Sequence, residues 1–454
     1  MVADQSELNG IVALSVWAAG IEAIDDSALM ERASDAMADT LACALAGRED
    51  EATRAVARAA ELSHGAGHAA LWGMGRSLSM AGAALVNGTA AHALDFDDNF
   101  APSMAHASAV LVPSLLAMAS GLEPVAGKHL LTAYIIGIEL QARIGHVMHP
   151  DHYRAGWHAT STLGTIGAAG ACAWLAGAGS EGIAHAMSLA FSQAAGSKLQ
   201  FGSQAKPTHA GLAARAAVTA AMLAKSGLGA KEAFATGPWS FAELYNGNGK
   251  DFDIDGLGKR WALLDTGLMV KRFPCCAASH RALDGIETMI SAHGFGLEDI
   301  AEISVELPDM LARNLRYDAP KTEAEARFSL SYPVLLMVQK GSLSLFDFTA
   351  KALASTPLRT HFEKVRRVAV PMGPEGPNMP NKITVTLADG KILQHVQHDL
   401  VGNGSKALNA GQKEAKLSDC LTWAKLSARQ AEISSACSAL ESSKDILTCL
   451  APLA

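Results

Sequence analysis

Apolar residues recur at helical spacing through the first half of the chain. From about Leu8 to Leu228 the spacing is that of helices with a buried face, and short Gly-rich breaks separate the periodic stretches. The predicted helices are Ser27–Ala46, Met80–Leu94, Ser108–Ser120, Gly127–His146, Ser161–Ala176 and Gly211–Ser226. This succession predicts a helical bundle.

The pattern changes in the second half of the chain, where apolar and polar residues alternate. The predicted strands are Ile303–Leu307, Ile383–Leu387 and Ile392–Val396, the last two joined by a turn at Ala388-Asp389-Gly390. Strands are expected only here. The predicted helices of this half lie around Arg281–His293 and from Ser331 to Val338, and helical periodicity returns from Asp419 to Leu450.

Together these patterns predict a mainly α protein with a large all-helical domain and a smaller α+β lid domain. The stretch Asn246–Gly267 is rich in Gly and Asp and carries little periodicity, so a boundary is placed near it. We assign residues 1–268 to the helical domain, completed by residues 400–454, and residues 269–399 to the lid domain.

Composition excludes several classes of protein. The chain has 454 residues, of which 49% are apolar and 18% charged, and a formal net charge of -8. It can therefore bury a large core, and the absence of any Lys or Arg block argues against nucleic acid or an anionic membrane as a partner. The apolar stretches Ala107–Ala119 and Leu163–Ala178 are too short, or too rich in Gly and Ala, to span a bilayer.

The cysteines and the N-terminus indicate a cytoplasmic protein. Seven cysteines are spread along the chain without paired Cys-x-x-Cys motifs, which is typical of a reducing compartment. Asp4 and Glu7 stand where a signal peptide would carry basic residues. The Gly-rich piece Gly73-Met74-Gly75 lacks the strand, helix and downstream acid of a dinucleotide fingerprint, so a nucleotide-dependent enzyme is disfavoured.

The first candidate segment is acidic and lies between two predicted helices. Asp95, Asp97 and Asp98 follow the first helix, and His106 precedes the next. Three carboxylates can bind a divalent cation, or one can orient a histidine while the others cap the helix near Ser108. We favour capping and orientation, because a hard-cation loop normally supplies more oxygen ligands.

The second segment, His146–Thr160, is rich in histidine, a spacing that also suits a transition metal. Pro150 interrupts a continuous helical face of ligands. His158 follows the tight Gly156-Trp157 turn and is expected to point into a pocket, whereas His146 and His149 are expected to be capping or surface residues.

The third segment places Lys206 before Pro207 and close to His209, ahead of an Ala-rich helix. A residue before proline is expected to be extended, so Lys206 would lie outside the helix beside free backbone N–H groups, where a carboxylate can bind. The alternative is an ordinary solvated lysine.

The fourth segment runs from Lys271 and Arg272 to the adjacent thiols Cys275 and Cys276, at the predicted domain junction. Either cation can fix a substrate carboxylate, and the alternative is a basic linker. The thiols are expected to be packed or to line the pocket, because adjacent cysteines rarely bridge each other. Tyr332, near Arg327, is a weaker candidate, since a tyrosine there is often core.

In this order the segments resemble the MmgE/PrpD family, which includes 2-methylcitrate dehydratase, cis-aconitate decarboxylase and iminodisuccinate epimerase. The resemblance runs from about Leu29 to about Leu400, and its strongest matches are Asn87–Asp98, Gly156–Thr160, Lys206–His209 and Lys271–Pro274. It implies a helical domain with an α+β lid, a site between them, a homodimer, and no metal or organic cofactor. The implied site residues are Asp95, His106, His158, Lys206, Lys271 and Tyr332.

Two departures concern the reaction. Asn99 replaces a threonine that often follows the aspartates, and Cys276 stands where decarboxylase-like members carry histidine. The acidic segment and the approach to His158 also differ from the methylcitrate dehydratase style.

We therefore expect proton transfer next to a carboxylate of a small di- or tricarboxylate. Lys206 and Lys271 would supply positive charge, and His106 or His158 would exchange the proton. Asp95 would orient a histidine and Tyr332 would donate from the opposite face. The further substrate-binding candidates are Asn99, His209, Arg272 and Cys276.

Several outcomes remain open for such a site. An epimerase similar to iminodisuccinate epimerase, or a lyase similar to cis-aconitate decarboxylase, is preferred to a dehydratase of a 2-methylcitrate-type hydroxy acid. A non-catalytic, metabolite-binding helical dimer is the alternative from another class.

Overall fold

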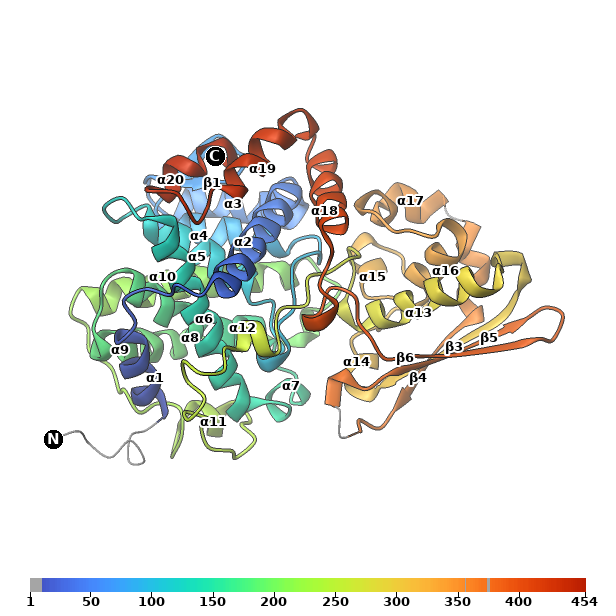
Figure 1. The fold of residues 1–454 in the computed structure, drawn as a ribbon, viewed down its shortest axis with the longest axis horizontal. Coiled ribbons are helices and arrows are strands. Elements are labelled where there is room, and N and C mark those ends of the chain that lie inside the picture. The colour runs from blue at the N-terminus through green and yellow to red at the C-terminus, as the bar shows by residue number, and fades with distance from the viewer. Residues whose placement is uncertain (1–9, 356, 374–375) are drawn as a thin grey trace.

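The protein is mainly α, with a large helical part and a smaller α+β part, as a computed structural model shows (Figure 1). The structure describes residues 10–355, 357–373 and 376–454. The helices of the first part are α1 (Gly10–Ala19), α2 (Ser27–Gly47), α3 (Glu51–Ser63), α4 (Met80–His92), α5 (Ser108–Ala119), α6 (Gly127–Met148), α7 (Asp151–Arg154), α8 (Ala159–Leu175), α9 (Ser180–Phe191), α10 (Ala205–Lys225), α11 (Phe241–Leu244) and α12 (Ala262–Asp265). The chain returns to this part through α18 (Ala410–Trp423), α19 (Gln430–Ser438) and α20 (Ile446–Cys449).

Small side chains let the central helices approach closely. Helix α10 packs against α4, α8 and α9, and a Cβ atom on Gly88 of α4 would lie 2.9 Å from the Cα atom of Gly211 in α10. Alanine and glycine at this crossing therefore keep both backbones near contact, which a larger residue would prevent. Helix α4 ends and α10 begins next to the candidate site residues, so the close crossing fixes where those residues lie.

Two features of the helical part differ from the sequence prediction. Strands β1 (Ala69–Leu71) and β2 (Arg76–Leu78) form an antiparallel hairpin, although strands were expected only in the second half. Three-residue strands are too short to show alternation. Helix α10 begins at Ala205, so Lys206 lies in its first turn and is not held outside it. Pro207 is tolerated there because first-turn N–H groups have no helical partner.

The α+β part has one mixed sheet covered by helices. Its strands are β3 (Ile300–Pro308), β4 (Val365–Val370), β5 (Asn381–Leu387) and β6 (Ile392–Gln397), in the order β4-β3-β5-β6, with β3 parallel to β4 and the other pairs antiparallel. Its helices are α13 (Ala277–His293), α14 (Asp309–Ala312), α15 (Glu323–Arg327), α16 (Ser331–Lys340) and α17 (Ala350–Ser355). Strand β4 was not predicted. The predicted domain limits at residues 268 and 400 stay a prediction.

The two parts are joined by backbone pairing as well as by side chains. Asn99 and Met269 exchange two backbone hydrogen bonds of 2.9 and 2.7 Å, and Met269 also bridges Asn403. Phe201 of the helical part belongs to the core of the α+β part. The segments after α4, before α13 and before α18 therefore meet at one junction.

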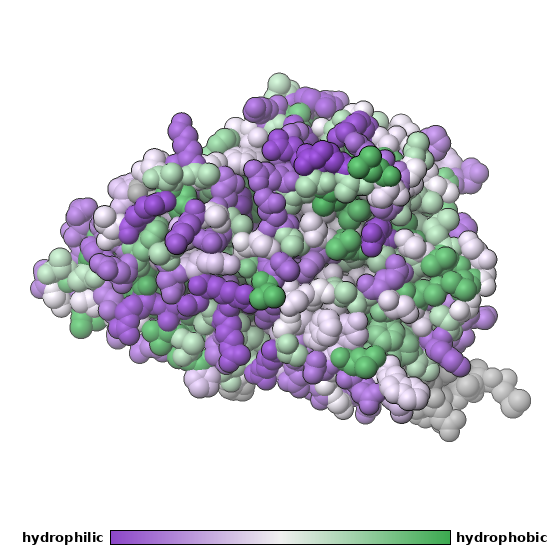
Figure 2. Space-filling view, turned by 180° about the vertical axis from the view of Figure 1, so that it is seen from behind, coloured by the Kyte–Doolittle hydropathy of each residue, from purple (hydrophilic) through white to green (hydrophobic). Residues whose placement is uncertain are grey.

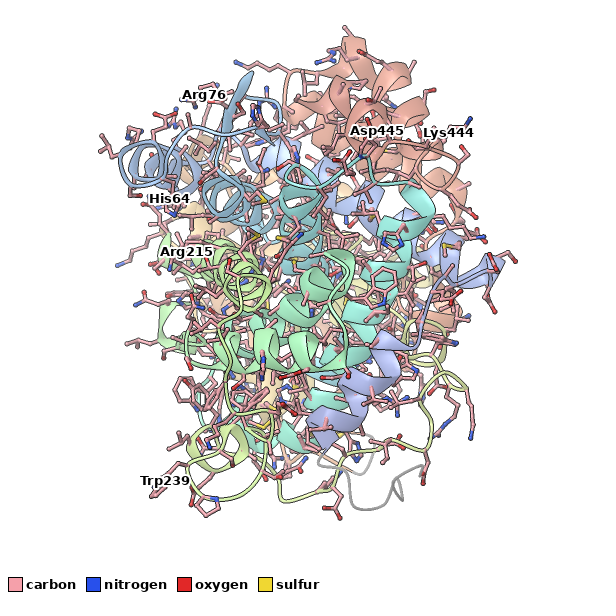
Figure 3. The ribbon with its side chains drawn as sticks, turned by 90° about the vertical axis from the view of Figure 1, so that its left-hand side faces the viewer. His64, Arg76, Arg215, Trp239, Lys444 and Asp445 are labelled. Carbon is pink, nitrogen blue, oxygen red and sulfur yellow. The ribbon has the colours of Figure 1, made fainter. Side chains whose placement is uncertain are left out.

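The surface is mixed in character. No helix of the described residues is long and apolar enough to cross a membrane. Seen from behind, hydrophobic residues form small groups separated by hydrophilic ones (Figure 2). On the end of the helical part that faces away from the sheet, Arg76, Arg215 and Lys444 are well separated, and Lys444 lies beside Asp445 (Figure 3). These three cations do not form a continuous strip of the kind a nucleic-acid backbone requires.

The helix crossing gives a first prediction. In Gly211→Ala the added methyl group overlaps the Leu85 carbonyl oxygen and the Thr89 hydroxyl, so we expect a loss of about 2–3 kcal/mol in the free energy of unfolding. Urea denaturation measures it. Gly411→Ala, whose Cβ atom meets no atom closer than 3.4 Å, is the matched control and should be neutral or stabilising by up to about 1 kcal/mol. Equal effects of the two substitutions would contradict the close crossing.

Candidate active site

A cavity of about 130 Å³ lies where the helical part meets the α+β part. Six of the residues expected at the site from the sequence line it: Asp95, Asn99, His106, His158, Lys206 and Cys276. They come from the loop after α4, the approach to α5, the start of α8, the first turn of α10 and the start of α13. The structure therefore brings together segments separated by up to 180 residues.

Asp95 lies between two lysines at the wall of this cavity. Its backbone has a φ of 53° directly after α4, a left-handed conformation that reverses the chain. One carboxylate oxygen pairs with Lys206, and the other accepts a hydrogen bond of 2.9 Å from Lys271 Nζ. The Asp95 carbonyl accepts a second one of 2.7 Å from the same ammonium. The three side chains thus form a buried ion triplet.

Burial and charge act in opposite directions within the triplet. Burial raises the pKa of Asp95, but the charges of Lys206 and Lys271 outweigh it and hold the pKa well below its usual range. Burial lowers the pKa of Lys271, but Asp95 and Asp97 outweigh it and hold that pKa above its usual range. Asp95 and Lys271 are therefore charged at neutral pH, and with the ammonium group of Lys206 the triplet carries one net positive charge.

Asp97, not Asp95, orients the histidines. Its carboxylate accepts a hydrogen bond of 2.9 Å from His92 Nδ1, and one of its oxygens lies 3.0 Å from His106 Nδ1, at ion-pair distance. Burial raises the pKa of Asp97, but the two imidazoles outweigh it and hold the pKa well below its usual range. Because an ionised carboxylate only accepts hydrogen bonds, both rings carry their proton on Nδ1. Each Nε2 then presents a lone pair, and the expectation that Asp95 orients a histidine is wrong.

Both histidines held by Asp97 are neutral at neutral pH. Burial lowers the pKa of His92, and it lowers the pKa of His106 to about 3. The nearby lysine charges act in the same direction, because a second cation close to Lys206 is unfavourable. An anionic ligand in the cavity would reverse that contribution.

His158 enters the cavity from the start of α8. Its backbone N–H donates to the Gly196 carbonyl at 3.0 Å, and its Nδ1 lies 2.9 Å from Nδ1 of His209. The ring meets Phe201 edge to face at a centroid distance of 5.1 Å. Burial and the charge of Lys206 hold its pKa well below the usual range. His158 therefore also lies in the cavity as a neutral imidazole, with His209 behind it.

The third aspartate of the segment caps a helix. Asp98 accepts a hydrogen bond of 3.3 Å from the backbone N–H of Ser108, the first residue of α5, and another from the Ser108 hydroxyl. Burial raises its pKa to about 7. The three carboxylates have separate partners, so they do not converge on one cation.

Two expected site residues lie elsewhere. Tyr332 is buried in the core of the α+β part, and its hydroxyl donates to the Asp347 carbonyl at 2.6 Å. Arg272 is turned away from the cavity and forms a two-point ion pair with Glu287. Neighbouring residues on one backbone point to different sides, so Lys271 reaches Asp95 behind the cavity wall while Arg272 does not. Both assignments are corrected.

Three residues of the cavity were not predicted from the sequence: Arg281, Asn314 and Tyr153. Arg281 lines the cavity from α13, and Asn314 donates a hydrogen bond of 2.8 Å to the hydroxyl of Tyr153. Helix α13 begins at Ala277, which puts Ala277, Ala278 and Arg281 on one face. Helical spacing counted from that residue would have identified Arg281. No sequence signal identifies Asn314.

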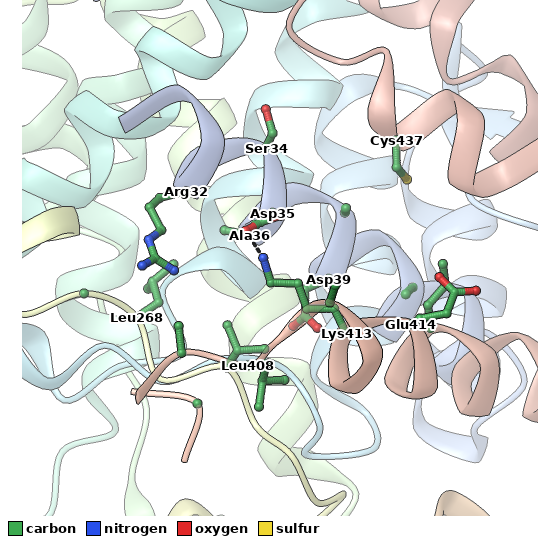
Figure 4. A pocket seen from close by; sticks show the side chains of 18 of the residues that line it. Arg32, Ser34, Asp35, Ala36, Asp39, Leu268, Leu408, Lys413, Glu414 and Cys437 are labelled. Carbon is green, nitrogen blue, oxygen red and sulfur yellow. Dashed lines mark hydrogen bonds and ion pairs between the residues drawn. The ribbon is translucent and has the colours of Figure 1, made fainter. Parts of the chain in front are cut away.

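A larger hollow of about 370 Å³ lies between α2 and α18 and is a weaker candidate (Figure 4). Its acidic residues Asp35 and Asp39 are already paired with Lys413 and Lys416. Among the described residues that line it there is no histidine, so it lacks a group that exchanges protons near neutral pH. The cavity beside Asp95 is therefore the candidate active site.

Comparisons with known proteins cover almost the whole chain. The profile of the MmgE/PrpD N-terminal domain matches residues 12–254, and that of the MmgE/PrpD C-terminal domain matches residues 273–441. The chain is 28% identical to cis-aconitate decarboxylase from Mus musculus over 72% of this chain and 69% of the relative. It is 28% identical to the Homo sapiens protein of the same name over 75% and 73%. It is 25% identical to the cis-aconitate decarboxylase-like protein oryM from Aspergillus oryzae over 86% of both chains.

The buried histidines predict acid lability. Their native pKa values lie below 6.5, so the unfolded chain binds more protons and the free energy of unfolding falls as pH drops below about 6.5. Burial lowers the pKa to about 3 for His106, His149 and His280 and to about 4 for His152 and His209. Asp98 and Asp284, with raised pKa values, oppose this only in part.

We therefore expect a loss on the order of several kcal/mol between pH 7 and pH 5. Urea denaturation at both pH values measures it. Equal or greater stability at pH 5 would show that these imidazoles are not buried in the neutral form.

Removing the anion of the ion triplet, Asp95, is expected to lower the free energy of unfolding strongly. Asp95→Asn leaves Lys206 and Lys271 buried without a countercharge, so we expect the free energy of unfolding to fall by about 3–5 kcal/mol. Asp25→Asn is the matched control, because Asp25 and Lys128 form an exposed pair whose loss costs at most about 1 kcal/mol. Thermal or urea unfolding of both variants makes the comparison, and a similar small effect in each is the contrary result.

Proposed function

The chain belongs to the MmgE/PrpD family, and we propose that it is a lyase that removes carbon dioxide from a small, unsaturated polycarboxylate. Three cis-aconitate decarboxylases or decarboxylase-like relatives align over most of the chain. The single observation that carries the proposal is the cavity in which two cations and two neutral imidazoles meet. Such a cavity suits a substrate with several carboxylates and a carbon that gains a proton.

Two cations are available to hold the substrate. Lys206 lines the cavity from α10 and Arg281 from α13, so one carboxylate is held by each part of the molecule. The net positive charge of the Asp95 triplet adds attraction, and the buried position strengthens it. Asn99 and Cys276, also in the lining, would contact the rest of the substrate and set its shape.

His106 is the proposed proton carrier. Its Nδ1 lies 3.0 Å from a carboxylate oxygen of Asp97, so the carboxylate stabilises the imidazolium that forms when Nε2 accepts a proton. A bound polyanion offsets the lysine charges and raises the pKa of His106, so a proton enters with the substrate. His158, in the same cavity, assists from a second position.

The chemical step balances with that one proton. The bond between the substrate carbon skeleton and one carboxylate breaks, carbon dioxide leaves, and the electron pair of the bond stays with the carbon skeleton. The proton on His106 Nε2 forms the new C–H bond, and the neutral imidazole is regenerated. Lys206 stabilises the negative charge that develops on a neighbouring carboxylate.

Epimerisation is the second candidate, because two imidazoles face one cavity with ring centroids 6.3 Å apart. One would remove an α-proton and the other would return a proton to the opposite face. A dehydratase would use the same groups to expel a hydroxyl. A non-catalytic metabolite-binding dimer would need no group that transfers a proton. The proposed enzyme is also a homodimer.

One set of incubations separates these functions. Purified protein in deuterated water is given cis-aconitate, iminodisuccinate isomers or methylcitrate, and carbon dioxide, deuterium uptake and products are followed. Carbon dioxide with one deuterium in the product supports the lyase. Deuterium uptake and isomerisation without release of carbon dioxide support the epimerase. Loss of water from the substrate supports the dehydratase. No change in any substrate supports the binding protein and contradicts the proposal.

Replacing the proton carrier tests the role of His106. His106→Gln should lower kcat by about 10²–10⁴-fold, with the melting temperature close to that of the wild type. Tyr332→Phe and Arg272→Gln serve as controls, because both residues lie outside the cavity. Steady-state kinetics on the accepted substrate measure all three, and a kcat of His106→Gln near the wild-type value contradicts the assignment.

Substrate binding should take up a proton. At pH 7 the histidines of the free site are neutral, so a saturated tricarboxylate that cannot react should bind with an uptake approaching one proton per site. Isothermal titration calorimetry in buffers of different ionisation enthalpy measures this number. The uptake should vanish in His106→Gln, and binding with no uptake in the wild type would refute the proposed charge coupling.

A further inference from the structure

Three imidazoles meet beside the cavity in an arrangement that acid/base chemistry does not require. One nitrogen from each of His92, His106 and His158 lies within 4.8 Å of the other two. Their residues are 1%, 8% and 1% exposed. They come from the end of α4, the approach to α5 and the start of α8, so the fold, and not one local motif, brings them together.

The free nitrogens are of the kind that binds metal ions. Asp97 accepts the Nδ1 proton of His92 and lies 3.0 Å from Nδ1 of His106. The nearby carboxylate favours the proton of each ring on Nδ1, which leaves a lone pair on Nε2. His92 Nε2 and His158 Nε2 are buried and have no hydrogen-bond partner among the described residues. Buried polar atoms are nearly always paired, so these two nitrogens indicate a missing partner.

The groups behind the rings resemble the second layer of a metal site. Metal-binding histidines usually donate their other N–H to a carboxylate or another acceptor, which fixes the ring and its tautomer. Asp97 contacts Nδ1 of the His92 and His106 rings. For His158, the distance from its Nδ1 atom to Nδ1 of His209 is 2.9 Å. The scaffold for three ligands is thus already in place.

We propose that His92, His106 and His158 form a site for one Zn²⁺ or similar divalent transition-metal ion, and that the ion inhibits the enzyme. The inhibition rests on the proposed function, because the ion would occupy the nitrogen of His106 that carries the proton. Zn²⁺ binds three histidines at about 2.0–2.1 Å and leaves a fourth position open. A water molecule would complete the tetrahedron.

Charge and geometry both allow the ion. Asp95 lies between Lys206 and Lys271, and Asp97 lies beside two of the rings, so both carboxylates offset positive charge near the ion. Tetrahedral ligand atoms at about 2.0–2.1 Å from the ion stand roughly 3.4 Å apart. Ring nitrogens that lie up to 4.8 Å apart therefore have to approach each other by up to about 1.4 Å. Small side-chain rotations supply this movement.

Binding is tested first, with zinc chloride alone. Protein freed of metal by chelator and dialysis is titrated by equilibrium dialysis with metal analysis. His92→Gln removes one ligand that does not line the cavity, and we expect it to weaken the tight site at least tenfold. His185→Gln is the matched control, because His185 belongs to the other candidate group, the more exposed Glu181, His185 and Glu232, and it should leave the tight site unchanged.

A second readout does not depend on a variant that folds. Wild-type protein titrated with Co²⁺ should develop the visible absorption of a four-coordinate ion, and Zn²⁺ should remove it. Absence of a tight ion in the wild type, octahedral Co²⁺ only, or equal zinc affinity in wild type and His92→Gln overturns the site.

Activity is tested separately, on whichever substrate turns over. Zinc should inhibit the wild type competitively with substrate, and chelator should restore full activity. Tight zinc binding without inhibition overturns the inhibitory role. Activity lost with chelator and restored by zinc overturns both that role and the proposed proton carrier. Tight zinc binding by a protein that turns over no substrate supports the site and contradicts the proposed function.

Discussion

The buried pairing of Asp95 with Lys206 and Lys271 is the interaction on which the rest of the structure depends. Removing three charges from water costs many kcal/mol unless they compensate each other. The three residues come from α10, the loop after α4 and the strand-like segment before α13, so only the complete junction brings them together. The charge pairing thus selects the arrangement in which the helical part and the α+β part meet.

That pairing also sets the chemistry of the cavity. Two ammonium groups beside the histidines favour neutral rings, and Asp97 decides which nitrogen of His92 and His106 carries the proton. The free site therefore offers lone pairs and positive charge together. An incoming polyanion changes the balance, so substrate binding and protonation are coupled through the same few contacts.

The three aspartates of the segment after α4 have different partners. Asp95 faces the lysines, Asp97 the histidines and Asp98 the start of α5. The left-handed backbone at Asp95 makes this separation possible, because it turns the chain before the next side chain. One four-residue segment thereby joins the charge triplet, the imidazoles and a helix cap.

The sequence predicted the long helices and most of the sheet, because their periodicity reflects burial directly. Helix α10 starts earlier than predicted, since Pro207 fits a first turn as well as it ends a helix. The charged and imidazole side chains in apolar surroundings, such as Lys206 and His158, were found by their unusual setting. The partners of these side chains were not predicted. Asp95 contacts the lysines and Asp97 the histidines because of the left-handed backbone at Asp95, which the sequence does not reveal.

Two residues near the domain junction, Tyr332 and Arg281, were not placed correctly from the sequence. Tyr332 fell on the core side of α16, where its hydroxyl has a backbone partner. Arg281 had no motif of its own and became visible only once the start of α13 was known. Side-chain direction at a domain junction follows from tertiary packing, which spacing along one chain does not encode.

The most direct test of the account is a crystal structure with a saturated tricarboxylate bound. The account predicts one carboxylate on Lys206, another on Arg281, and a carbon of the ligand within contact distance of His106 Nε2. A ligand seated in the hollow between α2 and α18, or one that leaves Lys206 and His106 without contact, would contradict it.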